Sequence, residues 1–468
     1  MKNIVRILFL VAILAGSVVF STVSPTQAQV TPGICDNPVD VLTAAFCAAR
    51  EAIEEERSID LTIVKQWTFE QQEFTNGIDW GCIDGIAAVD VRPVYYGWEF
   101  RFTALNNEVH TARVSFVDLD TVAVCDEVAL ATDAPAPSTA PTNPNLPAPV
   151  TGAGAAGTFE LGGHVNGLGT QTVSNMQAAG MTWVKKQLRF RVGDGTGQAE
   201  AFINDANSKG FKILLGIVGY TDEMTNYDQY IQDYATFVGQ VAAKMTQGGA
   251  IEVWNEPNID REWPNGRISG AEYTRLLAAA YNAIKTANPN VIVISGAPAP
   301  TGAEAAFPGA VVNDDNFMRQ MRDAGAAAYM DCLGLHYNEG IVSPTQNSGD
   351  PRPYYPTQYF GSMLARGANI FPDRPVCWTE LGYLSGEGMG EPIPPAFSWA
   401  ENVTVAQQAQ WLAEAAQLSR QSGRVRIMII WNVNFELWGS DPMGGYAMMR
   451  PDGTCPACST LGAVMRGS

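Results

Sequence analysis

Residues 251–258 read IEVWNEPN, so an apolar run stops at an asparagine and a glutamate and a proline follows at once. A second stretch, residues 376–382, reads VCWTELG and also ends its apolar run on a glutamate. In a barrel of parallel strands, polar residues at strand ends are where reacting groups lie. Both stretches therefore predict barrel strands, with Glu256 and Glu380 at the open end.

The chain around these stretches alternates short β-branched runs with helical segments, the order that builds a parallel sheet covered by helices. Eight strands are predicted over residues 159–165, 183–190, 212–218, 251–254, 291–295, 332–337, 376–380 and 426–431. Helices between them are predicted over residues 227–245, 271–287, 314–324 and 405–422, the last with Asn402 and Thr404 as candidate caps.

Eight strand–helix units across about 310 residues predict an α/β fold, a (β/α)8 TIM barrel. The last helix must be short, since about ten residues follow Cys458. An open, doubly wound sheet is the alternative. Residues 162–167, GGHVNG, do not match the glycine-rich turn typical of such a sheet.

Composition divides the chain before the barrel domain, which we place at residues 158–468. Residues 132–157 are rich in Pro, Ala, Thr and Gly, which is typical of a linker. Residues 29–131 are expected to form a small α+β domain, with a helix over 41–56 and strands over 59–68, 91–105 and 108–124. Its aromatic residues either form a small core, which we favour, or a sugar-stacking platform. These residues are Tyr95, Tyr96, Trp98 and Phe100.

Residues 1–28 predict a secretory signal peptide, because Lys2 and Arg6 precede an apolar run over 7–20 and small residues follow near Ala28. An uncleaved anchor is the alternative, but this run is short for a membrane span. We expect a secreted or periplasmic protein without stable membrane insertion.

The formal net charge of −19 makes nucleic acid and anionic membrane surfaces poor partners. The sequence indicates no particular protein partner.

Cysteine usage suits an oxidising compartment. Four cysteines in the first third permit two disulfides in any of three pairings: Cys35, Cys47, Cys82 and Cys125. For the pair Cys455 and Cys458 we favour a structural disulfide over half a zinc site or a redox pair. Cys332 and Cys377 begin two predicted strands, and the sequence leaves open whether they bond.

The sequence lacks the motifs that other kinds of catalytic or metal site require. The chain has 3 histidines, His110, His164 and His336, and lacks a Gly-x-Ser-x-Gly elbow, a His-Glu-x-x-His motif and a phosphate loop. We therefore expect no cofactor and no metal site.

Glu256 and Glu380 lie about three strand–helix units apart, which places them on strands that face one another across the barrel mouth. Such a pair of carboxyl groups is what glycoside hydrolysis needs.

With these motifs the sequence resembles clan A, the large clan of retaining (β/α)8 glycoside hydrolases that includes the family 5 cellulases and mannanases and the family 39 xylosidases. Those enzymes carry Asn-Glu at the end of strand four and a glutamate at the end of strand seven, where this chain has Asn255-Glu256 and Glu380. The resemblance covers about residues 158–460 and implies hydrolysis of a β-linked poly- or oligosaccharide. It implies that Glu256 is the acid/base, Glu380 the nucleophile and Asn255 a ligand of the sugar 2-hydroxyl.

The resemblance also implies further substrate-binding residues. Trp431, at the end of predicted strand eight, corresponds to the tryptophan that floors the cleavage subsite. His336-Tyr337 resembles the His-x-Tyr of strand six, and both residues are candidates. Asn338 stands in the place of the family's tyrosine, which leaves open which side chain touches the nucleophile.

The two glutamates need different environments. An acid/base needs a raised pKa, which an ionised neighbour about 5 Å away would supply, whereas the nucleophile must stay ionised. Arg189 and His336 are our candidate donors to Glu380. Clan members often carry an arginine after strand two, and Lys185, Lys186 and Arg191 compete with Arg189 for this role.

His164, at the end of predicted strand one, either binds a sugar hydroxyl or is structural. Four aromatic residues on the same rim are more often packed than sugar-binding: Tyr220, Trp263, Phe435 and Trp438. Two other functions remain open: a protein that binds a glycan without cleaving it, and a transglycosidase that uses the same two glutamates.

Overall fold

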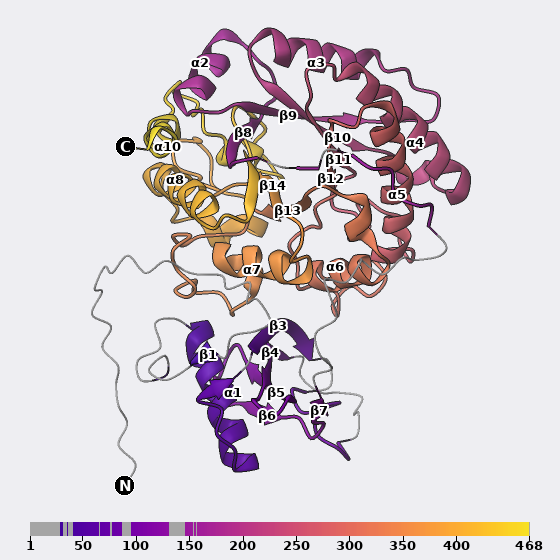
Figure 1. Cartoon of the computed structure of the whole chain (residues 1–468). Helices are drawn as coiled ribbons and strands as arrows, with labels where there is room; N and C mark the ends of the chain where they lie inside the picture. Colours follow the sequence, from indigo (N-terminus) through magenta and orange to yellow (C-terminus); the bar gives the residue numbers. More distant parts are fainter. Residues whose placement is uncertain are drawn as a thin grey trace.

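The structure is a computed structural model. It describes residues 29–30, 35, 41–64, 66–74, 77–86, 95–130, 146–152, 154–155 and 157–467. The predicted signal peptide, residues 1–28, lies outside the described residues, as does most of the predicted linker. A barrel ringed by helices forms the larger part, and a small domain lies beside helices α6 and α7 (Figure 1). Within the ranges given, no helix combines the length and apolar character needed to cross a bilayer.

Eight parallel strands form the wall of the barrel. They are β8 (Glu160–His164), β9 (Trp183–Arg189), β10 (Lys212–Val218), β11 (Ala250–Val253), β12 (Ile292–Ser295), β13 (Leu333–Tyr337), β14 (Val376–Leu381) and β15 (Val425–Ile430). They are hydrogen-bonded in the order β12-β11-β10-β9-β8-β15-β14-β13. A parallel bridge between Ile294 and Cys332 joins the two ends of this order and closes the ring. The predicted (β/α)8 barrel is confirmed.

Each strand is followed by a helix that covers the outside of the ring. The helices are α2 (Thr170–Ala178), α3 (Gly197–Ser208), α4 (Tyr227–Lys244), α5 (Gly270–Ala287), α6 (Asp314–Asp323), α7 (Phe360–Ile370), α8 (Val405–Gln421) and α10 (Pro456–Arg466), and the short α9 (Met443–Tyr446) precedes α10. Thr404 caps α8 by accepting a hydrogen bond from the Gln407 amide, while the Gln407 side chain accepts one from the Thr404 amide. Of the two expected caps, Thr404 fills the position.

Apolar residues close the amino-terminal end of the barrel. Trp183, Leu214 and Ile427, near the starts of their strands, form a buried cluster with Ala155. Residues 146–152 run over this end: Tyr329 Oη donates to the Pro147 carbonyl at 2.6 Å, and Asn282 donates to the Ala148 carbonyl at 3.0 Å. The carboxyl-terminal part of the Pro- and Gly-rich stretch therefore packs against the barrel.

Four disulfides join all eight cysteines. Cys332 and Cys377, which the sequence left open, are bonded between the start of β14 and the residue before β13. The cysteines of the first third pair as Cys35–Cys47 and Cys82–Cys125. Cys455 and Cys458 bond with each other at the start of α10.

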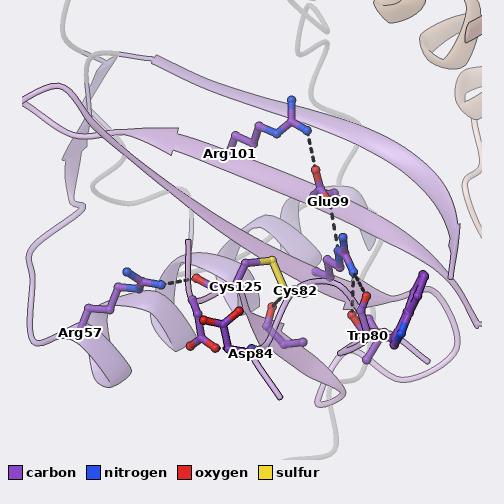
Figure 2. Close-up of a disulfide and its surroundings, with 11 residues drawn as sticks. Arg57, Trp80, Cys82, Asp84, Glu99, Arg101 and Cys125 are labelled. Carbon is purple, nitrogen blue, oxygen red and sulfur yellow. Dashed lines mark hydrogen bonds and ion pairs between the residues drawn. A yellow bond between two sulfur atoms is a disulfide. The ribbon is translucent and has the colours of Figure 1, made fainter. Parts of the chain in front are cut away.

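The small domain is an antiparallel sheet packed against one helix. The helix is α1 (Val41–Arg57), and the strands are β3 (Gln66–Phe74), β4 (Tyr95–Thr103), β5 (Glu108–Ser115), β6 (Val122–Val124) and β7 (Ala129–Leu130), with the pair β1 (Gln29–Val30) and β2 (Ile63–Val64) beside them. Beside the Cys82–Cys125 disulfide, the buried Glu99 accepts hydrogen bonds from Arg101 and Arg113 (Figure 2). The predicted α+β disulfide domain is confirmed.

Three of the four aromatic residues singled out on β4 have described side chains, and these three are packed. Trp98 and Phe100 are buried in the small domain's core. Tyr96 reaches the barrel, where its hydroxyl donates to the Gly302 carbonyl at 3.0 Å and its ring lies 4.8 Å from that of Tyr355. The side chain of Tyr95 lies outside the described residues. Residues 302 and 355 belong to the loops after β12 and β13, and Arg319 of α6 pairs with Glu70 of β3, so the small domain packs against the side of the barrel formed by α6, α7 and these loops.

Candidate active site

Glu256 and Glu380 meet at the carboxyl-terminal end of the barrel. The Nδ1 atom of His336, on β13, lies 3.2 Å from Glu256 Oε1 and 3.9 Å from Glu380 Oε2. These two oxygens are therefore separated by no more than the sum of the two distances. Both carboxylates are mostly buried, at 8% and 7% exposure. Two carboxyl groups from strands four and seven thus share one small polar site.

The backbone around Glu256 is held in an unusual conformation. Trp254 and Glu256 adopt positive φ angles of 78° and 45°, a region that costs side-chain-bearing residues of order 1 kcal/mol or more and is frequent at functional sites. The fully buried Asn258 fixes the turn, since its side chain donates to the carbonyls of Ala299 and Val312 and accepts from the Ala299 amide. The turn therefore aims the Glu256 carboxylate at the barrel axis with little freedom.

Lys185, on β9, is the cation beside Glu380. Its ammonium lies 3.2 Å from Glu380 Oε1 and 2.8 Å from Glu252 Oε2, and its side chain is fully buried. Burial lowers the pKa of Lys185, but the charges of Glu252 and Glu380 outweigh burial and raise it. Lys185 is therefore a permanent positive charge that stabilises the Glu380 carboxylate.

The expectation that Arg189 contacts Glu380 is wrong. Arg189 lies four residues farther along β9, pairs with Glu262 at 3.0 Å and donates to the Gly219 carbonyl. Lys186 donates to backbone carbonyls of the loop after β8, and Arg191 pairs with Asp222 and Glu223. Of the four basic residues weighed for this role, Lys185 fills it.

His336 joins the site to a buried acid below it. Its Nε2 atom lies 4.0 Å from Glu252 Oε1, and both side chains are fully buried. Burial lowers the pKa of His336, but the charge of Glu380 and the hydrogen bond with Glu256 outweigh it, so the pKa lies above its ordinary value. An imidazolium here faces three carboxylates and holds Glu256 in place. The described residues include no group of three or more His, Cys, Asp or Glu arranged to hold a metal ion.

The other oxygen of Glu256 faces Arg261. The Arg261 guanidinium contacts Glu256 Oε2 from the loop after β11. Burial raises the pKa of Glu256, but the hydrogen bond with His336 and the charges of His336 and Arg261 together bring it below its ordinary value. The raised pKa expected for an acid/base is therefore wrong, because two cations stabilise the carboxylate.

This arrangement predicts how activity depends on pH. The kcat/KM profile reports the free protein, so its alkaline limb, where Glu256 loses its proton, should lie on the acidic side of neutrality. Arg261→Gln removes one of the cations that lower the pKa of Glu256, and we expect the alkaline limb to move to higher pH. Initial rates between pH 3 and 9 on one aryl glycoside would measure it. A limb that stays in place or moves to lower pH would contradict the role of Arg261.

An aromatic wall stands beside Glu380. The ring of His164 lies 4.9 Å from that of Trp431 and 5.2 Å from that of Phe435, and its Nδ1 atom lies 3.9 Å from Glu380 Oε1. Burial, with the charges of Lys185, Lys186 and His336, lowers the pKa of His164 well below its usual range, so the ring is neutral. A neutral imidazole and two half-buried aromatic rings suit a sugar hydroxyl and the C–H face of a pyranose.

Asn255 and His164 also have free hydrogen-bonding capacity. Within the part of the chain that the structure describes, neither Asn255 Oδ1 nor His164 Nδ1 has a hydrogen-bond partner, although both atoms are buried. Buried polar atoms are rarely left unpaired, which makes them candidate contacts for a bound ligand. Both residues therefore remain candidates for substrate binding.

Two other candidates lie away from the site. Tyr337 is fully buried, packs against Phe360, Trp378 and Tyr383, and donates to the Gln358 carbonyl. Neighbouring residues of a strand point to opposite faces, so Tyr337 faces the helices where His336 faces the barrel interior. The expectation that Tyr337 binds substrate is wrong. Trp263 is likewise buried, against Trp254 and Tyr273.

Sequence reasoning missed Glu252 and Arg261. Glu252 had a signal, because a single acid inside the apolar strand AIEV needs a buried partner. Arg261 had none, since its role depends on how the loop after β11 folds back over Glu256. Tyr220, a rim candidate, stacks under the Arg191 guanidinium at 3.7 Å.

Comparison with solved structures finds glycosidases among similar chains. A glucosidase from Croceicoccus marinus is similar with 14% identity and a TM-score of 0.43, over 68% of each chain. An endo-1,4-beta-mannanase from Rhizomucor miehei has 14% identity and a TM-score of 0.45, over 68% of this chain and 99% of its own. A broad specificity endoglucanase from Clostridium acetobutylicum has 15% identity and a TM-score of 0.42, over 65% and 96%. No family model and no curated protein matches the chain.

Proposed function

We propose that this protein is a retaining glycoside hydrolase that cleaves a β-linked poly- or oligosaccharide. One observation carries the proposal: carboxylates from the ends of β11 and β14 lie within 4 Å of the same His336 nitrogen. Retaining enzymes hold their carboxyl groups about 5–5.5 Å apart, and inverting enzymes about 6.5–9.5 Å. The distances to His336 limit the separation of one oxygen of each carboxylate to at most their sum, and this limit accommodates the retaining spacing.

The proposed reaction gives each glutamate one role. Glu380, beside the Lys185 ammonium, attacks the anomeric carbon and forms a glycosyl ester, while Glu256 gives its proton to the departing oxygen. Glu256 then takes a proton from water, and the water cleaves the ester and restores both groups. His164, Asn255, Trp431 and Phe435 would hold the sugar ring against Glu380.

We propose that this reaction takes place outside the cytoplasm. All eight cysteines are in disulfides, which persist in oxidising compartments. The proposed signal peptide at residues 1–28 agrees with this location. Cleavage after about Ala28 would be read directly from the amino terminus of the exported protein.

A substrate screen tests the proposed function. The purified protein would be incubated with aryl β-glycosides and with cellulose, xylan, mannan and β-glucan oligosaccharides. Proton NMR would then record the anomer first released. We expect turnover of at least one substrate with retention of the β configuration. First release of the α anomer would overturn the retaining mechanism.

Two further outcomes separate the alternatives. Products longer than the substrate would indicate glycosyl transfer to another sugar in place of water. Binding without turnover across the whole panel would favour a glycan-binding protein over an enzyme.

A further inference from the structure

Arg261 covers one oxygen of the Glu256 carboxylate. Glu256 Oε1 lies 3.2 Å from the fully buried His336, whereas Oε2 faces the exposed Arg261 side chain, so we take Oε2 as the oxygen that donates the proton. The Arg261 guanidinium covers Oε2, and its side chain is 65% exposed. A glycosidic oxygen that takes its proton from Oε2 must therefore come to the side on which Arg261 lies.

Proton donation removes the partner of Arg261. Among the described residues, its ion-pair partners are Glu256 and Glu262, and the charge of Asp441 acts on it from farther away. Glu262 lies 3.6 Å from the Arg261 Nε atom and is already paired with Arg189 at 3.0 Å. When Glu256 carries the proton that it must donate, the Arg261 charge keeps only these weaker contacts.

We infer that the subsite on the leaving-group side binds a unit that carries an oxyanion, a carboxylate or a sulfate, and that Arg261 is the residue that recognises it. This inference rests on the proposed function. An arginine fork matches the geometry of such groups and binds them through paired, charge-assisted hydrogen bonds. An anionic leaving group replaces the contact that Arg261 loses when Glu256 is protonated, whereas a neutral one leaves this cation without a close partner.

The same exchange prepares Glu256 for its role. When a substrate anion takes Arg261, the guanidinium moves away from Glu256 Oε2. Burial still raises the pKa of Glu256 and His336 still lowers it, but the lowering by Arg261 is gone, so this pKa rises. The proton is thus held most firmly when the leaving group is in place, because the substrate itself removes the cation that favoured the carboxylate.

Aryl glycosides that differ in the charge of the leaving group test this inference. The probes are β-glycosides of 3-hydroxybenzoate, 3-hydroxybenzamide and 3-hydroxybenzenesulfonate, on a sugar that the wild-type protein turns over in the screen above. The ratio of kcat/KM for benzoate over benzamide is measured in wild type and in Arg261→Gln. Because both proteins meet the same phenols, intrinsic leaving-group reactivity cancels between them.

We expect this ratio to fall at least tenfold in Arg261→Gln, and Arg261→Lys to keep part of it, since lysine retains the charge but lacks the fork. Arg191→Gln is the matched control: it removes an arginine of the same rim that pairs with Asp222 and Glu223, and should keep the wild-type ratio. A matching fall for the sulfonate would indicate a site for either oxyanion, and a fall for the benzoate alone a carboxylate site. Equal ratios in wild type and Arg261→Gln would overturn the inference, whereas no turnover of any glycoside would overturn the proposed function itself.

Discussion

Glu380→Gln should lower kcat by about four orders of magnitude or more on every aryl glycoside, whatever its leaving group. Glutamine keeps the size and most contacts of Glu380, but its amide cannot form the ester on which the proposed reaction depends. Single-turnover and steady-state rates on a series of phenyl glycosides would measure the loss. Retention of more than about one part in a hundred of wild-type activity would contradict the assignment of the nucleophile.

Glu256→Gln provides the comparison, because proton donation matters only when the leaving group is poor. General acid catalysis accelerates bond cleavage about 10²–10⁴-fold, so the rate of the first step on a 4-methylphenyl glycoside should fall by that factor. The 2,4-dinitrophenolate group leaves without a proton, so the rate of the first step on its glycoside should fall far less. Similar losses on both glycosides would contradict the acid role of Glu256. Thermal unfolding of both variants would show that the barrel remains folded.

The barrel could be predicted because its strands are short apolar runs bounded by polar residues. Every strand lies within one residue of its predicted limits, including the runs that end at Glu256 and Glu380. The two glutamates were recognisable for the same reason, since a carboxylate at the end of a buried strand requires a chemical or structural explanation. Tyr337 could have been excluded by strand alternation, because its neighbour His336 already faces the interior.

The cation beside Glu380 could not be chosen from the sequence. Lys185 and Arg189 lie four residues apart on one strand and therefore on the same face, so alternation does not separate them. The two residues differ in their position along the barrel axis, and this position depends on the register between neighbouring strands. Lys185 pairs with His164, the last residue of β8, whereas Arg189 lies well beyond that level and meets the loop residue Glu262. Register and loop conformation are tertiary properties, and for this reason Arg261 also escaped prediction.

Lys185→Met should reduce both stability and activity, because it removes the ammonium that lies between the buried carboxylates of Glu252 and Glu380. Removing one partner of a buried ion pair costs about 3–5 kcal/mol, since the other charge stays buried without compensation. Glu252 is fully buried and would bear this cost. Loss of the ammonium beside Glu380 should also lower kcat by about 10²-fold or more. Urea unfolding and rates on an aryl glycoside would measure the two effects.

The double variant Lys185→Met/Glu252→Leu separates the two roles of Lys185. Replacing a buried ion pair by apolar side chains of similar size is often neutral or stabilising, so the free energy of unfolding should return to near the wild-type value. Activity should stay low, because Glu380 still lacks the cation that lies 3.2 Å from its Oε1 atom in the native protein. If the double variant regained both stability and activity, Lys185 would be a structural residue alone, and His336 would be the group left to stabilise Glu380.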